Sequence, residues 1–228
     1  MGGIAMRLRR RANLCLLVLA VWFIGSGTAR AANVHVETIV GIRHGEKPSD
    51  SLGQLNCAGL NRSLALPLVL LPRYGRPDFA FAPNPSVMSS SASGIYSYVR
   101  PLATIEPTAV QAHLPVNTQF GLNATKAIEH ELMRPRYRDA LIFIAWEHGY
   151  LDTIVRDLVK DYGGNAAVVP PWPENDYDSI FILQLRRRGS QLSVSFRHEH
   201  EGLTGHLSAM CPGVRSLASS SNPCSPAR

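Results

Sequence analysis

The sequence predicts an α/β domain, a three-layer sandwich in which helices flank a mostly parallel central sheet. It follows from the order of the expected elements, because β-branched and apolar segments alternate with segments of helical periodicity. The chain has 228 residues, of which 45% are apolar and 18% charged. This globular composition excludes a disordered protein, a collagen and a multi-span membrane protein. We expect one domain over residues 32–210.

The first elements follow from residue type. Residues 34–42 are largely β-branched, which favours a strand. Asn56 can cap a helix that continues towards Pro72, although Pro67 should kink or shorten it. A short apolar run at residues 78–82 lies between prolines and is typical of a second strand.

The middle of the chain is less regular. The serine-rich residues 87–99 are expected to form a helix that leads into Arg100, after which Pro101 and Pro107 should break the pattern. Residues 116–120 can form a third short strand. The later expected elements are a helix at 124–133, a strand at 141–146, a helix at 150–162 and a hairpin of strands at 180–185 and 192–196.

The amino-terminal segment has the three parts of a secretory signal. Basic residues Arg7 to Arg11 precede an apolar run at 14–24 and small residues at 29–31. We expect residues 1–31 to be removed, because the run is short for a bilayer of roughly 30 Å. The alternative is an uncleaved anchor. Cleavage predicts a periplasmic or secreted protein without a stable membrane span.

The formal charge of +6 is concentrated in that segment, where arginines at positions 7, 9, 10, 11 and 30 supply five positive charges and no acidic residue balances them. The remaining chain is close to neutral, so we expect no nucleic-acid partner. The basic residues 186–188 are expected at a soluble turn, because no aromatic stacking platform accompanies them.

Three cysteines remain after removal of the signal, which contains Cys15. Cys211 and Cys224 are close in sequence, so a small disulfide loop is expected within a loose tail at 211–228, with Cys57 as a buried free thiol.

Two strands end in the same pattern, Arg43-His44-Gly45 and Glu147-His148-Gly149. Carboxyl ends of strands line the ligand crevice of an open α/β sheet, so the two histidines could face one site. Arg43 adds a planar cation that matches phosphate oxygens. The pattern favours an anion-binding site, while either histidine alone could be a structural residue.

Residues 42–48, Ile-Arg-His-Gly-Glu-Lys-Pro, resemble the opening motif of the histidine phosphatase superfamily, the relatives of the cofactor-dependent phosphoglycerate mutases. Residues 55–60 resemble the helix-opening segment of that family, Arg100 with Thr104 its second pocket arginine, and residues 143–149 the strand that carries its second histidine. The resemblance implies a phosphoglycerate mutase-like fold.

The resemblance also implies roles for these residues. His44 would attack phosphorus and become a phosphohistidine, while Arg43, Arg100 and His148 hold the phosphate oxygens, without a metal or cofactor. Water would then hydrolyse the intermediate. We therefore expect an exported phosphomonoesterase that acts on a small-molecule or envelope phosphoester. Export disfavours an intramolecular mutase.

The proton donor departs from the family pattern, because residues 117–121 contain no carboxylate where many relatives place one. Glu147 is the first candidate, and Glu46, Glu129 and Glu131 are alternatives. A missing acid would favour substrates with good leaving groups. It also motivates the alternative of a catalytically weak or inactive protein that binds a phosphate ligand.

Two further signals are weighed against plainer explanations. The cluster at residues 198–201, together with His206, could bind a metal, but no His-Glu-x-x-His spacing accompanies it, so we expect none. Trp172 could cover the pocket as a lid or belong to a packed loop.

Overall fold

The computed structural model describes residues 2, 33–49, 53–92 and 94–213. The expected signal at 1–31 lies, apart from residue 2, outside these residues, as do Cys224 and residues 214–228 of the expected tail. No helix in the described part of the chain is long and apolar enough to cross a membrane.

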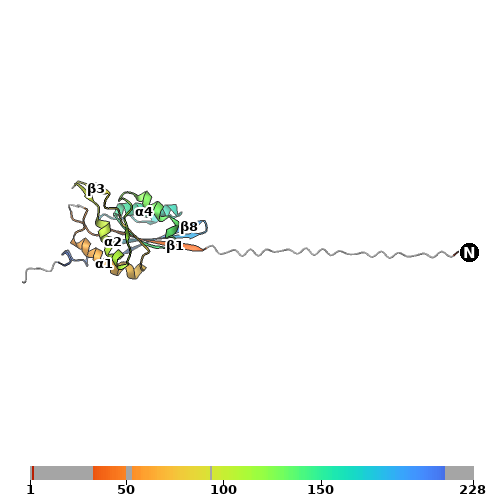
Figure 1. Cartoon of the computed structure of the whole chain (residues 1–228), viewed down its shortest axis with the longest axis horizontal. Helices are drawn as coiled ribbons and strands as arrows, with labels where there is room; N and C mark the ends of the chain where they lie inside the picture. The colour runs from red at the N-terminus through yellow and green to blue at the C-terminus, as the bar shows by residue number, and fades with distance from the viewer. Residues whose placement is uncertain (1, 3–32, 50–52, 93, 214–228) are drawn as a thin grey trace, which may run out of the picture. The chain divides into compact units, whose positions relative to one another are not determined.

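A six-stranded sheet runs through the domain in the order β5-β2-β6-β1-β7-β8 (Figure 1). The four strands β5, β2, β6 and β1 are parallel, whereas β7 is antiparallel to β1 and β8 antiparallel to β7. The mostly parallel sheet is therefore confirmed. Its strands are β1 (Val34–Arg43), β2 (Phe79–Phe81), β5 (Val116–Asn117), β6 (Leu141–Trp146), β7 (Ser179–Arg188) and β8 (Gln191–His200).

Helices cover both faces of this sheet. The helices are α1 (Cys57–Tyr74), α2 (Arg100–Gln111), α3 (Thr125–Leu132) and α4 (His148–Asp161), with short 3₁₀ turns η1 (Pro135–Tyr137) and η2 (Ala166–Val168). In β6, Ile142, Ile144 and Trp146 pack in the core with α3 and α4, whereas Phe143 and Ala145 pack in the core with α1 and α2. Alternate residues of a strand point to opposite faces, so a continuously apolar strand serves two cores. In Figure 1, α1 and α4 lie on opposite sides of the sheet, which confirms the three layers.

The expectation of a helix at residues 87–99 is wrong. This segment forms an antiparallel hairpin of β3 (Met88–Ser91) and β4 (Gly94–Ser97). Gly94 has a φ of 122°, which only glycine adopts easily, and it permits the turn. Serine competes with helix formation through its side chain, whereas Ile95 and Tyr96 favour extended backbone.

The expected interruption of the helices by proline does not occur. Pro101 lies in the first turn of α2, where the missing N–H has no intrahelical partner, and Pro107 lies inside that helix. Pro67 does not shorten α1, which continues to Tyr74, and its ring is buried. A proline costs about 3 kcal/mol inside a helix, and here the packing of the helix on the sheet outweighs it.

The expected start of α1 is confirmed, because the side-chain oxygen of Asn56 accepts a hydrogen bond from the N–H of Gly59 at 2.9 Å. The other expected strands and helices are confirmed to within a few residues, and the segment at 141–146 has the expected bounds.

The expected cysteine pairing is wrong, because Cys57 forms a disulfide with Cys211. Residues after β8 fold back along α1, where Asn61 donates from Nδ2 to the carbonyl oxygens of Ser208 and Met210, each at 2.8 Å. Closeness in space, rather than in sequence, selects the partner of Cys211.

Arg62 of α1 is fully buried among three carboxylates. Its Nη2 lies 2.7 Å from Oε1 of Glu46, and its Nη1 lies 3.4 Å from Oδ1 of Asp178 and also contacts Glu201. These acids come from the loop after β1, the start of β7 and the end of β8. The Arg62 cluster, formed by these four residues, therefore joins three segments that are distant in sequence.

We predict that Arg62→Met destabilises the domain by about 3–5 kcal/mol, because removal of one partner leaves buried carboxylates without a counter-charge. Chemical denaturation measures this loss. The matched control is Arg197→Met, since Arg197 is 58% exposed and pairs with Glu199 at 3.3 Å, and this change should cost less than about 1 kcal/mol. Equal losses in the two variants would contradict the prediction.

Candidate active site

The two strand-end motifs lie side by side. Strands β1 and β6 are parallel neighbours, with Arg43 in register with Trp146. The N–H of His44 donates to the carbonyl oxygen of Trp146 at 3.0 Å and continues the ladder by one residue. His44 and His148 therefore leave the sheet at the same edge, as the sequence predicted.

His44 is held as a neutral imidazole of one tautomer. Its Nδ1 lies 2.7 Å from the carbonyl oxygen of Gly45, which can only accept, so Nδ1 carries the proton and Nε2 keeps a lone pair. Burial lowers the pKa of His44 to about 3, and the positive charges of Arg100, Arg43 and Lys47 act in the same direction. The lone pair of Nε2 is thus available at neutral pH.

The backbone that carries His44 is fixed by α2. The N–H of Gly45 donates to Oγ1 of Thr104 at 2.9 Å, and this hydroxyl donates to the carbonyl oxygen of Arg100 at 2.8 Å. A Cβ on Gly45 would lie 2.8 Å from the carbonyl oxygen of Gly59, so only glycine permits this approach to α1. The first turn of α2 thereby positions Arg100 and the His44 loop together.

Arg43 is buried below the loop at residues 170–178. Its Nη1 donates to the carbonyl oxygens of Glu174 at 2.5 Å and Asp176 at 2.9 Å, and its Cζ lies 4.0 Å from the ring centroid of Tyr177. Its buried Nε has no hydrogen-bond partner among the described residues. An unsatisfied buried donor is costly, so this edge of the guanidinium is suited to an anionic ligand.

Arg100 is also buried and lies against an aromatic ring, with its Cζ 4.3 Å from the ring centroid of Tyr98. The ring of Tyr98 meets the imidazole of His44 edge-on, with the two centroids 5.8 Å apart. The centroid of the Tyr177 ring lies 6.1 Å from that of the same imidazole. Burial raises the pKa of Tyr98 to about 12, so its hydroxyl stays neutral. Two tyrosines thus flank the histidine.

The side-chain carboxylate of Glu147 caps α4. Its Oε2 accepts hydrogen bonds from the N–H groups of Gly149 at 3.0 Å and Tyr150 at 3.1 Å, while Oε1 lies 2.5 Å from Nδ1 of His148. Burial lowers the pKa of His148, with the charge of Glu147 opposing and that of Arg43 assisting the shift. The carboxylate that was the first candidate for the proton donor is therefore engaged as an acceptor.

The other candidate acids are engaged elsewhere. Glu46 pairs with Arg62, and Glu129 pairs with Lys126 at 2.9 Å. Glu131 accepts from Tyr137, which precedes the amino end of β6, at the edge of the sheet opposite His148. The structure therefore brings Arg43, His44, Arg100, Glu147 and His148 together and does not bring Glu129 or Glu131 to them.

Sequence reasoning missed Tyr177 and the carbonyl groups that hold Arg43. Trp172 belongs to a packed loop, because its ring lies 4.3 Å from that of Phe181 and its Nε1 donates to the carbonyl oxygen of Asp176 at 3.0 Å. The proline-rich sequence around Trp172 is the signal that could have located this rigid loop.

Within the residues that the structure describes, no group of three or more His, Cys, Asp or Glu side chains is placed to hold a metal ion. In the sequence cluster at 198–201, Nε2 of His198 lies 2.7 Å from Oγ of Ser179, and Glu201 belongs to the Arg62 cluster.

A neutral imidazole, two buried guanidinium groups and a second imidazole suit a tetrahedral dianion. The guanidinium groups can neutralise its charge in a site of low dielectric constant, and Nε2 of His44 keeps a lone pair. The arrangement can therefore bind a phosphate group and accept it covalently.

We predict that His44 makes the domain less stable in acid. Its pKa is about 3 when folded, below the ordinary value of 6.5, so between these values the unfolded chain binds more protons and stability falls as pH falls. The free energy of unfolding of His44→Asn should therefore decline less steeply between pH 6 and 4, by about 1 kcal/mol per pH unit. The exposed His130→Asn should keep the original slope, and parallel slopes for all three proteins would refute the prediction.

The similarity of this chain to known proteins lies in its fold. No family model and no curated protein matches the chain. The structure is similar to the putative phosphohistidine phosphatase SixA of Nakamurella multipartitia, with 12% identity and a TM-score of 0.50, covering 75% of this chain and 98% of that one. It also matches the putative phosphohistidine phosphatase SixA of Agrobacterium tumefaciens, with 12% identity and a TM-score of 0.46 over 71% and 97% of the two chains. A phosphoserine phosphatase mutant of Entamoeba histolytica matches with 10% identity and a TM-score of 0.40 over 73% and 98%. The first likeness shows that this chain has the expected fold.

Proposed function

We propose that the protein is a phosphomonoesterase of the histidine phosphatase superfamily and that His44 is its nucleophile. The observation that carries the proposal is the buried, neutral His44, whose Nδ1 is bound to the carbonyl oxygen of Gly45. Two buried arginines adjoin it, and Nε of Arg43 has no partner among the described residues. A phosphate ester would satisfy both the open donor and the open lone pair.

The reaction proceeds in two steps. Nε2 of His44 forms a bond to phosphorus while the bond from phosphorus to the ester oxygen breaks, and this oxygen leaves with the electron pair. Arg43, Arg100 and His148 hold the remaining oxygens. Water then attacks phosphorus while the bond from phosphorus to Nε2 breaks and its electron pair returns to Nε2. The proton that water loses passes through the solvent to the departed ester oxygen, so the products are phosphate, the alcohol and neutral His44. No step needs a metal ion or cofactor, because the guanidinium groups neutralise the charge.

The fold supports this class of enzyme without selecting a substrate. The similar protein of Nakamurella multipartitia is described as a putative phosphohistidine phosphatase. One fold serves many substrates, so that description does not transfer by fold alone. We propose a small-molecule or envelope phosphoester as the substrate of this chain.

We also propose that the protein is exported to the periplasm or secreted. Residues 1–31 have the parts of a cleavable signal, and the disulfide between Cys57 and Cys211 supports the proposal. Disulfides persist in oxidising compartments and are rare in the reducing cytosol.

A second candidate is a protein of the same fold that binds a phosphate ligand with weak or no turnover. The engagement of Glu147 as a helix cap favours it, because each alternative acid also has a partner. A good leaving group departs without a proton, so we favour the enzyme.

We predict that the purified full chain hydrolyses p-nitrophenyl phosphate in the presence of a chelator. His44→Asn should lower kcat roughly a thousandfold or more, because the nucleophile is lost. His130→Asn, an exposed histidine of α3, is the matched control and should retain full activity. Activity that disappears with the chelator, or survives in His44→Asn, would contradict the proposal.

A trapping experiment separates the two candidates. Rapid acid-free quenching with a ³²P-labelled phosphoester should yield an acid-labile, alkali-stable phosphoenzyme that His44→Asn lacks. A protein that binds phosphate and never becomes labelled is the binding protein.

We predict that Glu147→Gln lowers kcat for p-nitrophenyl phosphate and β-glycerophosphate by the same factor. We expect the Glu147 carboxylate to act as a helix cap, whereas loss of a true proton donor would affect the more basic alkyl leaving group selectively. The cap loss should cost roughly 1 kcal/mol of stability. Glu106→Gln, an exposed residue of α2, is the control. A loss confined to β-glycerophosphate would make Glu147 the acid.

A further inference from the structure

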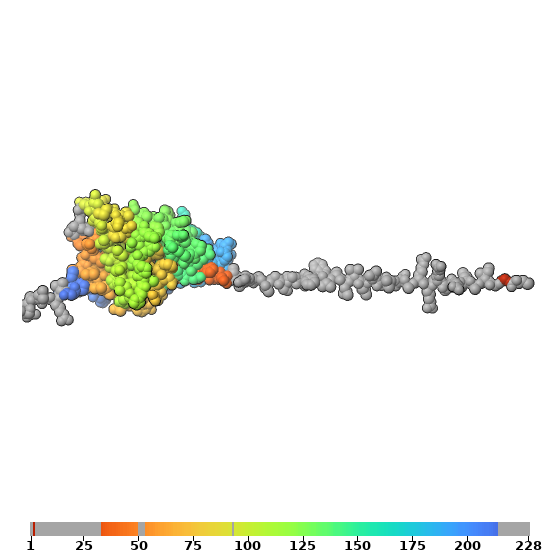
Figure 2. Space-filling view, in the orientation of Figure 1, coloured from red at the N-terminus to blue at the C-terminus, as the bar shows by residue number. Residues whose placement is uncertain are grey.

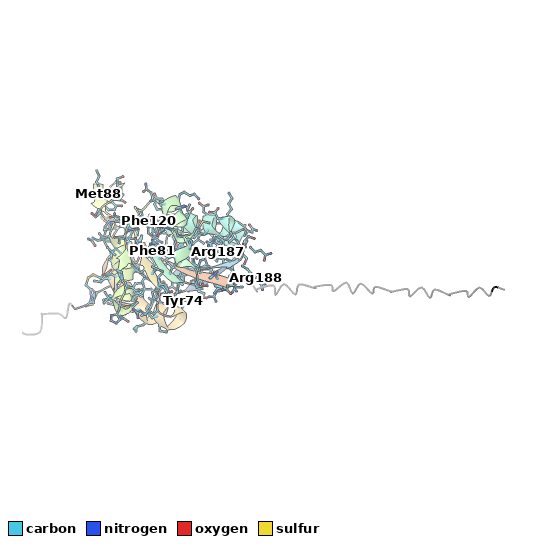
Figure 3. All side chains as sticks on the ribbon, turned by 45° about the vertical axis from the view of Figure 1, so that its right-hand side comes forward. Tyr74, Phe81, Met88, Phe120, Arg187 and Arg188 are labelled. Atoms are coloured by element: carbon cyan, nitrogen blue, oxygen red, sulfur yellow. A yellow bond between two sulfur atoms is a disulfide. The ribbon has the colours of Figure 1, made fainter. Side chains whose placement is uncertain are left out.

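A cavity of about 300 Å³ lies between the β3–β4 hairpin, residues 122–123 and the start of α4. The hairpin projects at the upper left of Figure 2, and Figure 3 places Met88 at the end of the domain opposite Arg187 and Arg188. We call this cavity the hairpin pocket. Its polar and aromatic walls are Tyr96, Tyr98, Tyr150, Ser89, Ser90 and Asn123.

The hairpin pocket borders the candidate active site on two sides. Tyr98 forms one wall, and its ring contacts both the imidazole of His44 and the guanidinium of Arg100. Tyr150 forms another, two residues after His148, and its N–H is bound by Glu147. The hairpin pocket therefore lies beside the residues that would hold the phosphate.

The walls are uncharged, and three tyrosines contribute to them. Among the described residues that line the pocket there is no Lys, Arg, His, Asp or Glu. The rings of Tyr96 and Tyr98 are stacked, with centroids 6.3 Å apart and planes inclined by 28°. Flat aromatic groups pack well against such rings, whereas a charged group would lose its hydration without gaining a counter-charge.

We propose that the hairpin pocket binds the leaving group and selects esters of an uncharged, flat ring, that is, aryl phosphates. This inference rests on the proposed function. The engaged carboxylates support it, because an aryl oxygen can leave with the electron pair of its bond to phosphorus and take a proton from water afterwards. The pocket and the capping role of Glu147 thus favour the same class of substrate.

The test compares phenyl phosphate with 4-carboxyphenyl phosphate, which differ mainly by one negative charge. The full chain should show a kcat/KM at least tenfold higher for phenyl phosphate. Ser89 faces Tyr96 across the hairpin, so Ser89→Arg places a cation in the pocket and should reduce this preference at least tenfold. Ser195→Arg on β8, an exposed serine outside the pocket, should leave the preference unchanged. Equal kcat/KM values for the two esters, or equal effects of the two arginine variants, would overturn the inference.

A binding measurement tests the pocket independently of turnover. Calorimetric titration of His44→Asn with the same two esters should show a tenfold or greater preference for phenyl phosphate, and orthovanadate should inhibit the unmodified chain. Inhibition and turnover without discrimination between the esters would overturn the pocket assignment and leave the proposed function intact. Discrimination in binding without turnover would overturn the proposed function and support the pocket.

Discussion

The parallel pairing of β1 with β6 is the constraint on which the candidate site depends. It aligns Arg43 with Trp146 and lets the N–H of His44 extend the ladder, so that the two His-Gly turns begin at one edge. A slip of one residue would exchange the two faces of a strand and turn Arg43 away from its carbonyl partners. The packing of the continuously apolar β6 in a core on each face of the sheet holds the strand beside β1.

That alignment buries positively charged side chains, and the free-energy cost of removing their charge from water has to be offset by other contacts. Arg43 is held by two carbonyl groups and a tyrosine ring, and Arg100 lies over a second tyrosine. A separate contact holds the loop after His44 in place, because Glu46 belongs to the Arg62 cluster. Elements as distant as the end of β8 therefore contribute to the rigidity of a site formed at the end of β1. Rigid positioning is what phosphoryl transfer demands of a protein.

The parts of the fold that sequence predicts well are those in which a local signal and the tertiary structure agree. The apolar run of β6 and the Asn56 cap are of this kind. Prediction failed where a distant partner decides the outcome. Packing on the sheet retains Pro67 and Pro107 inside helices, and the return of the chain along α1 brings Cys211 to Cys57. For the site, the repeated strand-end motif located both histidines and Arg43, and the family resemblance added Arg100. No sequence signal shows that Tyr177 would lie on Arg43.

The role of Glu147 follows from what its two oxygens can do at once. Its Oε2 accepts two backbone N–H groups at the start of α4. A proton donor must instead be protonated when the ester bond breaks. Oε2 of Glu147 serves the cap and Oε1 lies beside His148, so the chemistry that we propose at His44 suits a leaving group that is stable as an anion. Delocalisation of the charge into a ring provides that stability, and this is the reason for which we propose that the uncharged hairpin pocket, with its three tyrosines, receives such a ring.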